Sequence, residues 1–73
     1  MNLGRKINRH RKNSGETMEE FGKRFYAKSG VVSNWENNKQ KPNNKRLKIL
    51  ADDMGITVTE LLGSENNDGK SNY

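Results

Sequence analysis

The sequence predicts an all-α fold, with one compact domain of five short helices over residues 1–63 and a disordered polar tail over residues 64–73. Three observations support this prediction. Apolar residues recur at the spacing of amphipathic helices, no segment alternates as a strand would, and capping-box patterns punctuate the helical segments. Only 29% of the 73 residues are hydrophobic, but their periodic clustering favours a folded domain with a small core.

The first two helices are predicted from apolar spacing and from their caps. A helix is expected over residues 3–13, with Asn2 available to cap its N-terminus. The segment "TMEE", residues 17–20, has the capping-box pattern and is predicted to start the second helix. Phe21 and Phe25 lie one helical turn apart and are therefore expected to face the core.

The third helix, expected over about residues 29–37, is polar on its outer side. Val32 and Trp35 fall on one face, and hydroxyl and amide side chains fall on the other. Few charges accompany that outer face, which is unusual for a surface helix. Pro42 then prevents the helix from continuing.

The fourth and fifth helices follow the proline. Asn43 or Asn44 is expected to cap the fourth helix, and Gly55 suits a left-handed position at its end. The segment "TVTE", residues 57–60, repeats the capping-box pattern and predicts a fifth helix through residue 62, ended by Gly63.

Charge is distributed unevenly along the chain. Residues 1–48 carry 13 basic and 4 acidic side chains, whereas residues 49–73 carry 1 basic and 5 acidic ones, a contrast of +9 against −4. A basic surface confined to one part of a fold is typical of a polyanion binder, and nucleic acid is the commonest such partner. The alternative is that the lysines only solvate helix surfaces.

Composition also excludes several classes of site. The chain has no cysteine and a single His10, so it offers neither a disulfide nor a thiolate or multi-histidine metal site. No apolar run approaches the ~20 residues that span a bilayer, and no signal peptide is recognisable. We therefore expect a cytoplasmic protein without a membrane segment.

The assembled motifs resemble the XRE/Cro-like, or lambda-repressor-like, helix-turn-helix family. That family commonly reads I-G-x-x-I-R-x-L-R in helix one, S-Q-E-E-L-A-x-x-L-G-V-S in helix two and the turn, and I-S-x-W-E-N-G-x-x-x-P across helix three. This chain has "LGRKINRHR", "TMEEFGKRFYAK", "VSNWENNKQKP" and "RLKILADDMGITVTELL", in that order, over about residues 3–62. The resemblance implies a helix-turn-helix at helices two and three, with helix three in the major groove of DNA.

The resemblance also assigns candidate base contacts, by the register of Trp35. They are the outward residues at the start and middle of helix three: Lys28, Ser29, Gly30, Ser33 and Asn34. Asn34 is the preferred reader because a carboxamide can pair with N6 and N7 of adenine. The alternative for Asn34 is a solvated helix amide, and Lys28 could reach either guanine or a phosphate.

Phosphate contacts are implied at the start of helix two and in the loop after "WEN". The candidates are Thr17, Met18, Asn37, Asn38, Lys39, Lys41, Asn43, Asn44 and Lys45. Arg11 and Glu36 match an arginine and a glutamate that pair across the domain in similar proteins, and we expect this ion pair to be structural first.

Five residues depart from the family pattern. One of them, His10, stands where a leucine is usual and is expected to be partly buried. Tyr26 stands where a turn glycine with positive φ is usual, and Lys28 stands where a Ser or Thr cap is usual, so Ser29 is expected to cap helix three. Met18 replaces a glutamine that touches phosphate. Gly22 replaces a small alanine and is expected to loosen helix two.

The function implied by the resemblance is a sequence-specific regulator that binds double-stranded DNA, acting as a homodimer by analogy. Ile49, Leu61 and Leu62 are apolar candidates for the dimer surface. The alternative is an antitoxin-like module that uses the same fold to bind a protein partner. No constellation of nucleophile, base and orienting group is recognisable, so neither an enzyme, a cofactor nor a small-molecule substrate is expected.

Overall fold

The computed structural model describes residues 2–63, and every described element is helical. The helices are α1 (Leu3–Asn13), α2 (Met18–Arg24), α3 (Ser29–Glu36) and α4 (Asn44–Met54), and residues 58–63 form the described part of a fifth helix. The predicted all-α fold is confirmed. The tail predicted over residues 64–73 lies outside the described residues. Within 2–63, no helix is long and apolar enough to cross a membrane.

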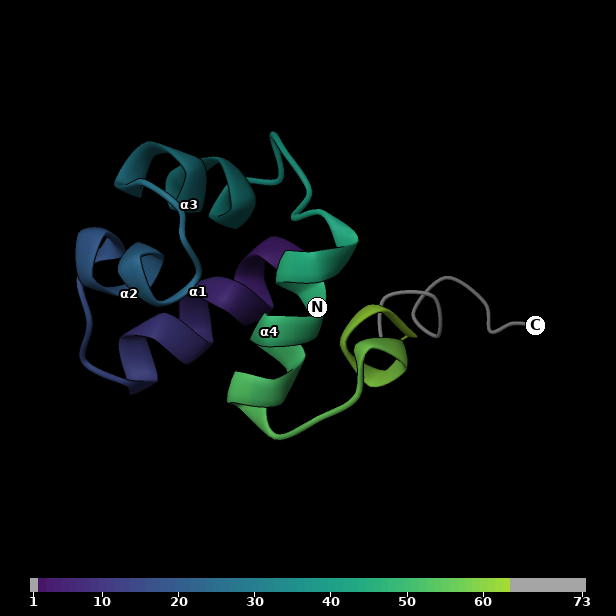
Figure 1. The fold of residues 1–73 in the computed structure, drawn as a ribbon. Coiled ribbons are helices and arrows are strands. Elements are labelled where there is room, and N and C mark those ends of the chain that lie inside the picture. The colour runs from purple at the N-terminus through teal and green to yellow at the C-terminus, as the bar shows by residue number, and fades with distance from the viewer. Residues whose placement is uncertain (1, 64–73) are drawn as a thin grey trace.

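Helix α1 runs through the middle of the molecule (Figure 1). The pair α2 and α3 lies on one side of it, and α4 with the helix at residues 58–63 lies on the other. Helix α3 packs against both α1 and α2. This arrangement leaves α3 at the edge of the molecule, where one of its faces is open to solvent.

The core lies where these helices meet. Its largest fully buried side chain is Trp35, which is 1% exposed, as the sequence predicted for the inner face of the third helix. The other buried apolar residues come from all five helical segments: Leu3, Ile7, Phe21, Phe25, Val32, Leu47, Leu50, Ala51 and Leu61. A small core is therefore assembled from nearly the whole described chain.

Side-chain caps fix most helix starts where the sequence placed them. Asn2 caps α1 and Asn43 caps α4, each side-chain oxygen accepting from the backbone N–H three residues on. Thr17 forms the predicted capping box of α2, and Thr57 makes the same reciprocal pair of bonds with Glu60. Capping therefore accounts for four of the five helix starts.

The start of α3 differs from the prediction. Lys28, not Ser29, occupies the N-cap position, and no side chain bonds the free N–H groups there. Ser29 is already the first helical residue, so its hydroxyl does not cap the helix. The first backbone N–H groups of α3 are left without a side-chain acceptor.

The end of α4 has the predicted left-handed glycine. Gly55 has φ +76°, and the backbone N–H of Ile56 donates to the carbonyl of Ala51 at 2.9 Å. This pair of features is a Schellman motif, which satisfies carbonyls at the helix end. Ile56 then packs on the core, and the chain turns back toward α1.

The two ends of the described chain are joined directly. Lys6 of α1 donates from Nζ to the backbone carbonyl of Leu61 at 2.6 Å. Leu61 itself is fully buried. The helix at residues 58–63 is thus held to α1 by a hydrogen bond and to the core by the buried side chain of Leu61.

A charged network covers the core where α1, α2 and α4 meet. Arg24 of α2 lies over the rings of Phe21 and Phe25 and donates to carboxylates of Glu16 and Asp53. The hydrogen bond from Arg24 lowers the pKa of Asp53, and the bond to Asp53 raises the pKa of Arg24. His10 of α1, partly buried as predicted, lies 2.6 Å from the same aspartate.

Gly22 is a site of tight packing, and the expectation that it loosens α2 is wrong in its physical basis. A Cβ built on Gly22 would lie 2.2 Å from the carbonyl oxygen of Ala27 and 3.2 Å from Cγ2 of Val32. The Ala27 amide also donates to the carbonyl of Gly22. The missing side chain therefore permits the close approach of the turn between α2 and α3.

We predict that Gly22→Ala lowers the free energy of unfolding by about 1–3 kcal/mol, because the backbone of the turn must shift. Gly30→Ala is the matched control. A Cβ there meets no atom within 4 Å, so alanine should raise stability by about 0.5–1 kcal/mol through helix propensity. Urea unfolding of both variants measures the difference, and equal gains in stability would contradict tight packing at Gly22.

Candidate nucleic-acid interface

The outer face of α3 carries small polar side chains. Ser29 and Gly30 are exposed at its first turn, and Ser33 and Asn34 are partly exposed one turn later. Lys28 is exposed at the N-cap. Four of the five predicted base-contact residues thus lie on one open face of α3, and Lys28 lies just before the helix. None of the five is buried.

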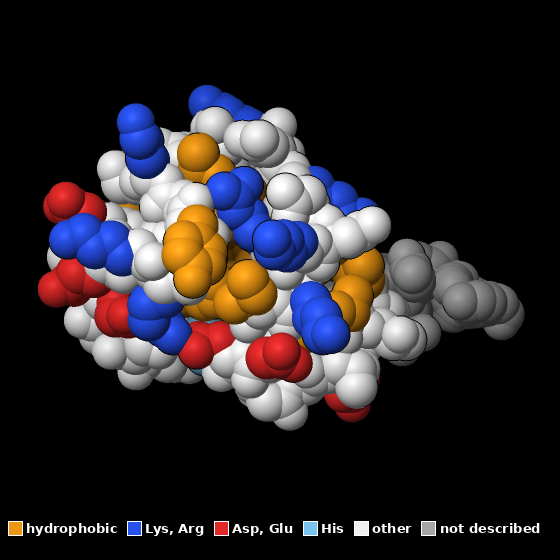
Figure 2. All heavy atoms as spheres, in the orientation of Figure 1, with side chains coloured by type: hydrophobic (Ala, Val, Ile, Leu, Met, Phe, Trp, Pro, Cys, Tyr) orange, Lys and Arg blue, Asp and Glu red, His pale blue; other side chains and the backbone are white. Residues whose placement is uncertain are grey.

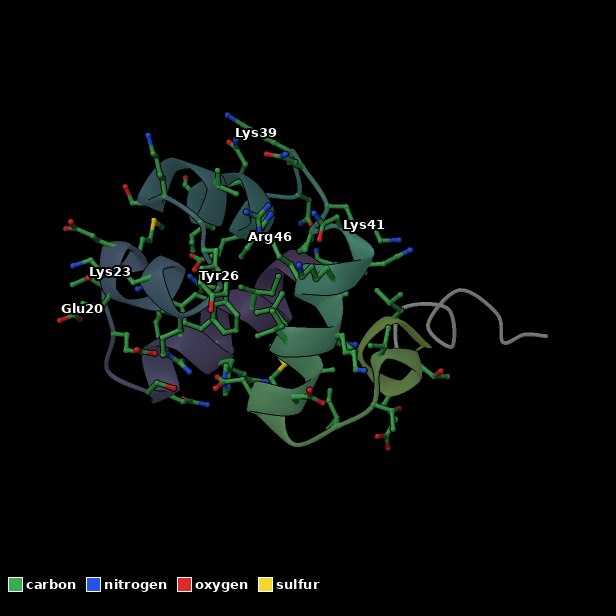
Figure 3. The ribbon with its side chains drawn as sticks, in the orientation of Figure 1. Glu20, Lys23, Tyr26, Lys39, Lys41 and Arg46 are labelled. Atoms are coloured by element: carbon green, nitrogen blue, oxygen red, sulfur yellow. The ribbon has the colours of Figure 1, made fainter. Side chains whose placement is uncertain are left out.

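The inner face of α3 is anchored. Val32 and Trp35 are fully buried, and the guanidinium of Arg46 from α4 lies 5.9 Å from the centre of the Trp35 ring. Arg46 also donates to the backbone carbonyls of Phe25 and Tyr26 at the end of α2. One side chain of α4 therefore holds both helices of the helix-turn-helix (Figure 3).

The turn before α3 has the strained conformation that the sequence predicted. Tyr26 has φ +59°, and its side chain is 83% exposed. Left-handed backbone costs a non-glycine residue roughly 1–2 kcal/mol. The ring gains little burial in return, so the packing around Gly22 and the bonds from Arg46 hold the turn in place.

The loop after α3 is tied back onto α1 and α3. Asn38 has φ +60°, and its side-chain oxygen accepts from the backbone N–H of Gly4 at 3.1 Å. Asn37 donates from Nδ2 to the carbonyl of Ser33 at 2.9 Å and lies 3.3 Å from its hydroxyl. These two predicted phosphate contacts therefore also shape the protein itself.

Among the other predicted phosphate contacts, the three lysines are exposed cations and two residues cap helices. Lys39, Lys41 and Lys45 are exposed, and Figure 3 shows Lys39 and Lys41 projecting outward from the connection between α3 and α4. Asn44 is exposed as well, whereas Asn43 and Thr17 each use a side-chain oxygen as a cap. Lysine supplies charge here, and the capped helices supply backbone N–H groups.

A polar depression beside α3 is lined by residues of α1, α2 and α3 and of the loop after α3. It is lined by Asn2, Arg5, Asn8, Met18, Glu36, Asn37 and Asn38. Met18, Asn37 and Asn38 were predicted from the motifs, but the residues from α1 were not. Arg5 is exposed and brings a cation to this depression. Helical spacing predicts that Arg5 points outward, but not that it lies beside α3.

The floor of this depression contains a nearly buried ion pair. The side chain of Glu36 is 4% exposed and that of Arg11 is 12% exposed, and Arg11 donates to Glu36 through Nε at 2.6 Å and Nη2 at 3.2 Å. Asn8 donates to the same carboxylate at 2.8 Å. The hydrogen bond from Arg11 to Glu36 raises the pKa of Arg11. The pair joins α1 to the end of α3.

Acidic side chains are absent from one part of the described surface. In Figure 2, the upper part, around α3 and the start of α4, shows Lys and Arg without Asp or Glu, whereas the Asp and Glu side chains at the left and bottom lie beside other Lys and Arg side chains. The described residues contain no group of three acidic or histidine side chains arranged to hold a metal ion. The face around α3 therefore suits a polyanion.

Among solved structures, the chain is similar to the P22 c2 repressor protein, crystallised in complex with synthetic operator 9T in the presence of Tl+. The likeness has a TM-score of 0.77, covers 85% of this chain and 94% of that chain, and has 24% sequence identity. The chain has the lambda-repressor-like fold. No family model and no curated protein matches the chain. The likeness confirms the fold that the motifs predicted.

The first prediction from this geometry concerns strain at Tyr26. Tyr26→Gly should be more stable to unfolding than Tyr26→Ala by about 1 kcal/mol, because only glycine adopts φ +59° without a steric penalty. Comparing two variants that both lack the ring isolates the backbone effect. Thermal unfolding measures it, and equal stability of the two variants would show that the turn is unstrained.

A second prediction concerns the carboxylate at the end of α3. Glu36→Gln should lower the free energy of unfolding by about 3 kcal/mol, because it leaves the Arg11 charge nearly buried without its counter-ion. Glu19→Gln, at an exposed position of α2, is the control and should change little. A loss below about 1 kcal/mol for Glu36→Gln would match a solvent-exposed pair and contradict this account.

Proposed function

We propose that the chain is a sequence-specific regulator that binds double-stranded DNA through the outer face of α3. One observation carries the proposal. Trp35 is 1% exposed on the inner face, while the opposite face of the same short helix presents only small polar groups to solvent. A helix of this kind fits the major groove of B-form DNA, which admits one α-helix. The DNA complex of the similar P22 c2 repressor supports the same partner.

Asn34 and the first turn of α3 are the proposed base readers. The carboxamide of Asn34 can pair with N6 and N7 of adenine, and the hydroxyls of Ser29 and Ser33 can bond to several base edges. Gly30 would allow DNA to approach α3 closely. Its missing side chain is not required by packing within the protein, and it leaves room for a groove wall against the helix.

The proposed phosphate contacts flank these readers. Lys39, Lys41 and Lys45 lie beyond the end of α3, and Arg5 lies in the polar depression near the start of α2. Cations on both sides of a groove-binding helix fix its register through the phosphates without reading sequence. The uncapped N–H groups at the start of α3 add positive potential on the same face.

A homodimer on DNA is part of the proposal, with half-sites about 34 Å apart. The fold removes one of the three apolar residues that the sequence offered for the dimer surface. Leu61 is fully buried in the core of its own chain and is removed from the predicted set, whereas Ile49 and Leu62 are only partly buried. These two remaining residues are the candidates for contact between two copies.

Selection of bound duplexes from a random pool tests the proposal, and it should enrich a palindrome with two half-sites. The logarithm of the binding constant should fall steeply with the logarithm of salt concentration, because bound lysines release counter-ions. Asn34→Ala should cost about 1–3 kcal/mol on the selected site and little on unrelated DNA. Gly30→Ala should also weaken specific binding, although it does not destabilise the fold.

Lys41→Gln is the matched control for these variants, because it removes an exposed cation outside the helix. It should weaken binding to all sequences alike and reduce the salt dependence by about one counter-ion. An unenriched pool, together with equally weak binding to every duplex, would contradict sequence-specific recognition.

A further inference from the structure

The loop after α3 closes onto a single residue of that helix. The backbone N–H groups of Lys39 and Gln40 both donate to the backbone carbonyl of Asn34, at 2.9 and 3.3 Å. These bonds place Gln40 beside Asn34, although six positions separate them along the chain. Lys39, the neighbour of Gln40, marks this loop in Figure 3.

The side chains of the same two residues also meet. Nδ2 of Asn34 donates to Oε1 of Gln40 across 3.4 Å, in an exposed position. A long, solvent-exposed amide contact contributes little to folding. What it supplies is direction: Oε1 of Gln40 faces Nδ2 of Asn34, and an acceptor there favours the Asn34 orientation that places Nδ2 toward the loop.

We propose that Gln40 is a positioning residue that sets the orientation of Asn34 for reading an adenine. This inference rests on the proposed function, because it concerns the same outer face of α3. The contact uses one N–H of Asn34, and the other N–H and Oδ1 make no further hydrogen bond within residues 2–63, so they are available to a base. That remaining donor and acceptor match N7 and N6–H of adenine.

Without Gln40, the carboxamide loses its neighbouring acceptor. The reversed orientation, with oxygen and nitrogen exchanged, then competes on equal terms, and it places like groups opposite N6 and N7. The expected consequence is a loss of base preference rather than a loss of fold. Gln40 lies in the loop, is exposed, and belongs to no helix.

A neighbouring contact supports this role for the loop. Nδ2 of Asn37 lies 3.3 Å from the hydroxyl of Ser33, the other mid-helix residue on the outer face. Ser33 thus accepts a bond from Asn37 and keeps its O–H as a donor. Two amides from the end of α3 and its loop therefore orient the two outward side chains of the second turn.

The test measures binding of the full chain to the selected duplex and to variants with each base replaced. Asn34→Ala first identifies the base pair that this residue reads. At that pair, the wild type should prefer adenine by about tenfold or more, in the range of a single bidentate contact. Gln40→Ala should lower this preference by about twofold, because two equally populated orientations halve the binding-competent fraction, without changing preference elsewhere in the site.

Two further variants separate positioning from a merely structural role. Gln40→Glu keeps an acceptor toward Nδ2 of Asn34, so it should retain the preference while lowering affinity for every duplex through phosphate repulsion. Gln40→Met keeps the length without the acceptor and should behave as Gln40→Ala. In the Asn34→Ala background, Gln40→Ala should cause no further loss of preference.

The outcomes distinguish this inference from the proposed function. If the wild type has no base preference at any position, the proposed function fails. If the wild type is selective and Gln40→Ala keeps full preference at the Asn34 position, the positioning role of Gln40 is overturned. The same conclusion holds if Asn34→Ala changes preference nowhere, or if Gln40→Glu loses the preference together with Gln40→Ala.

Discussion

The close crossing of α1 over the end of α3 is the constraint on which the rest of the structure depends. A Cβ on Gly4 would lie 2.6 Å from the carbonyl oxygen of Glu36 and 2.7 Å from that of Trp35, so only glycine permits this approach. At the same crossing, Asn38 accepts from the Gly4 N–H and Arg11 pairs with Glu36. Helix α3 is fixed at its end by backbone contact, polar bonds and the buried indole together.

This fixed end separates two roles within eight residues of helix. The inner face stabilises the domain, and the outer face contributes little to stability, so its side chains are available for contact with another molecule. The strain at Tyr26 fits the same division. The turn is held by Gly22 and Arg46 from neighbouring elements, so the surrounding structure maintains the left-handed conformation of Tyr26.

Local chemistry made much of the fold predictable. Capping groups at Asn2, Thr17 and Thr57 act within one helical turn, so their bonds can be inferred from spacing. Distances between helices are not encoded in that way. The space around Gly22, the depth of Leu61 and the link from Gln40 to Asn34 depend on how separate segments meet, and no local pattern shows them. The missing cap at Lys28 shows that this turn geometry overrides local preference.

The bond between Lys6 and Leu61 has a consequence for how the chain folds during synthesis. These residues are 55 positions apart, and Leu61 fills the core against helices made much earlier. A nascent chain that ends before residue 61 leaves that core open to water. Formation of the native domain must therefore wait until nearly all of residues 2–63 have emerged from the ribosome, because a shorter nascent chain lacks the residue that completes the core.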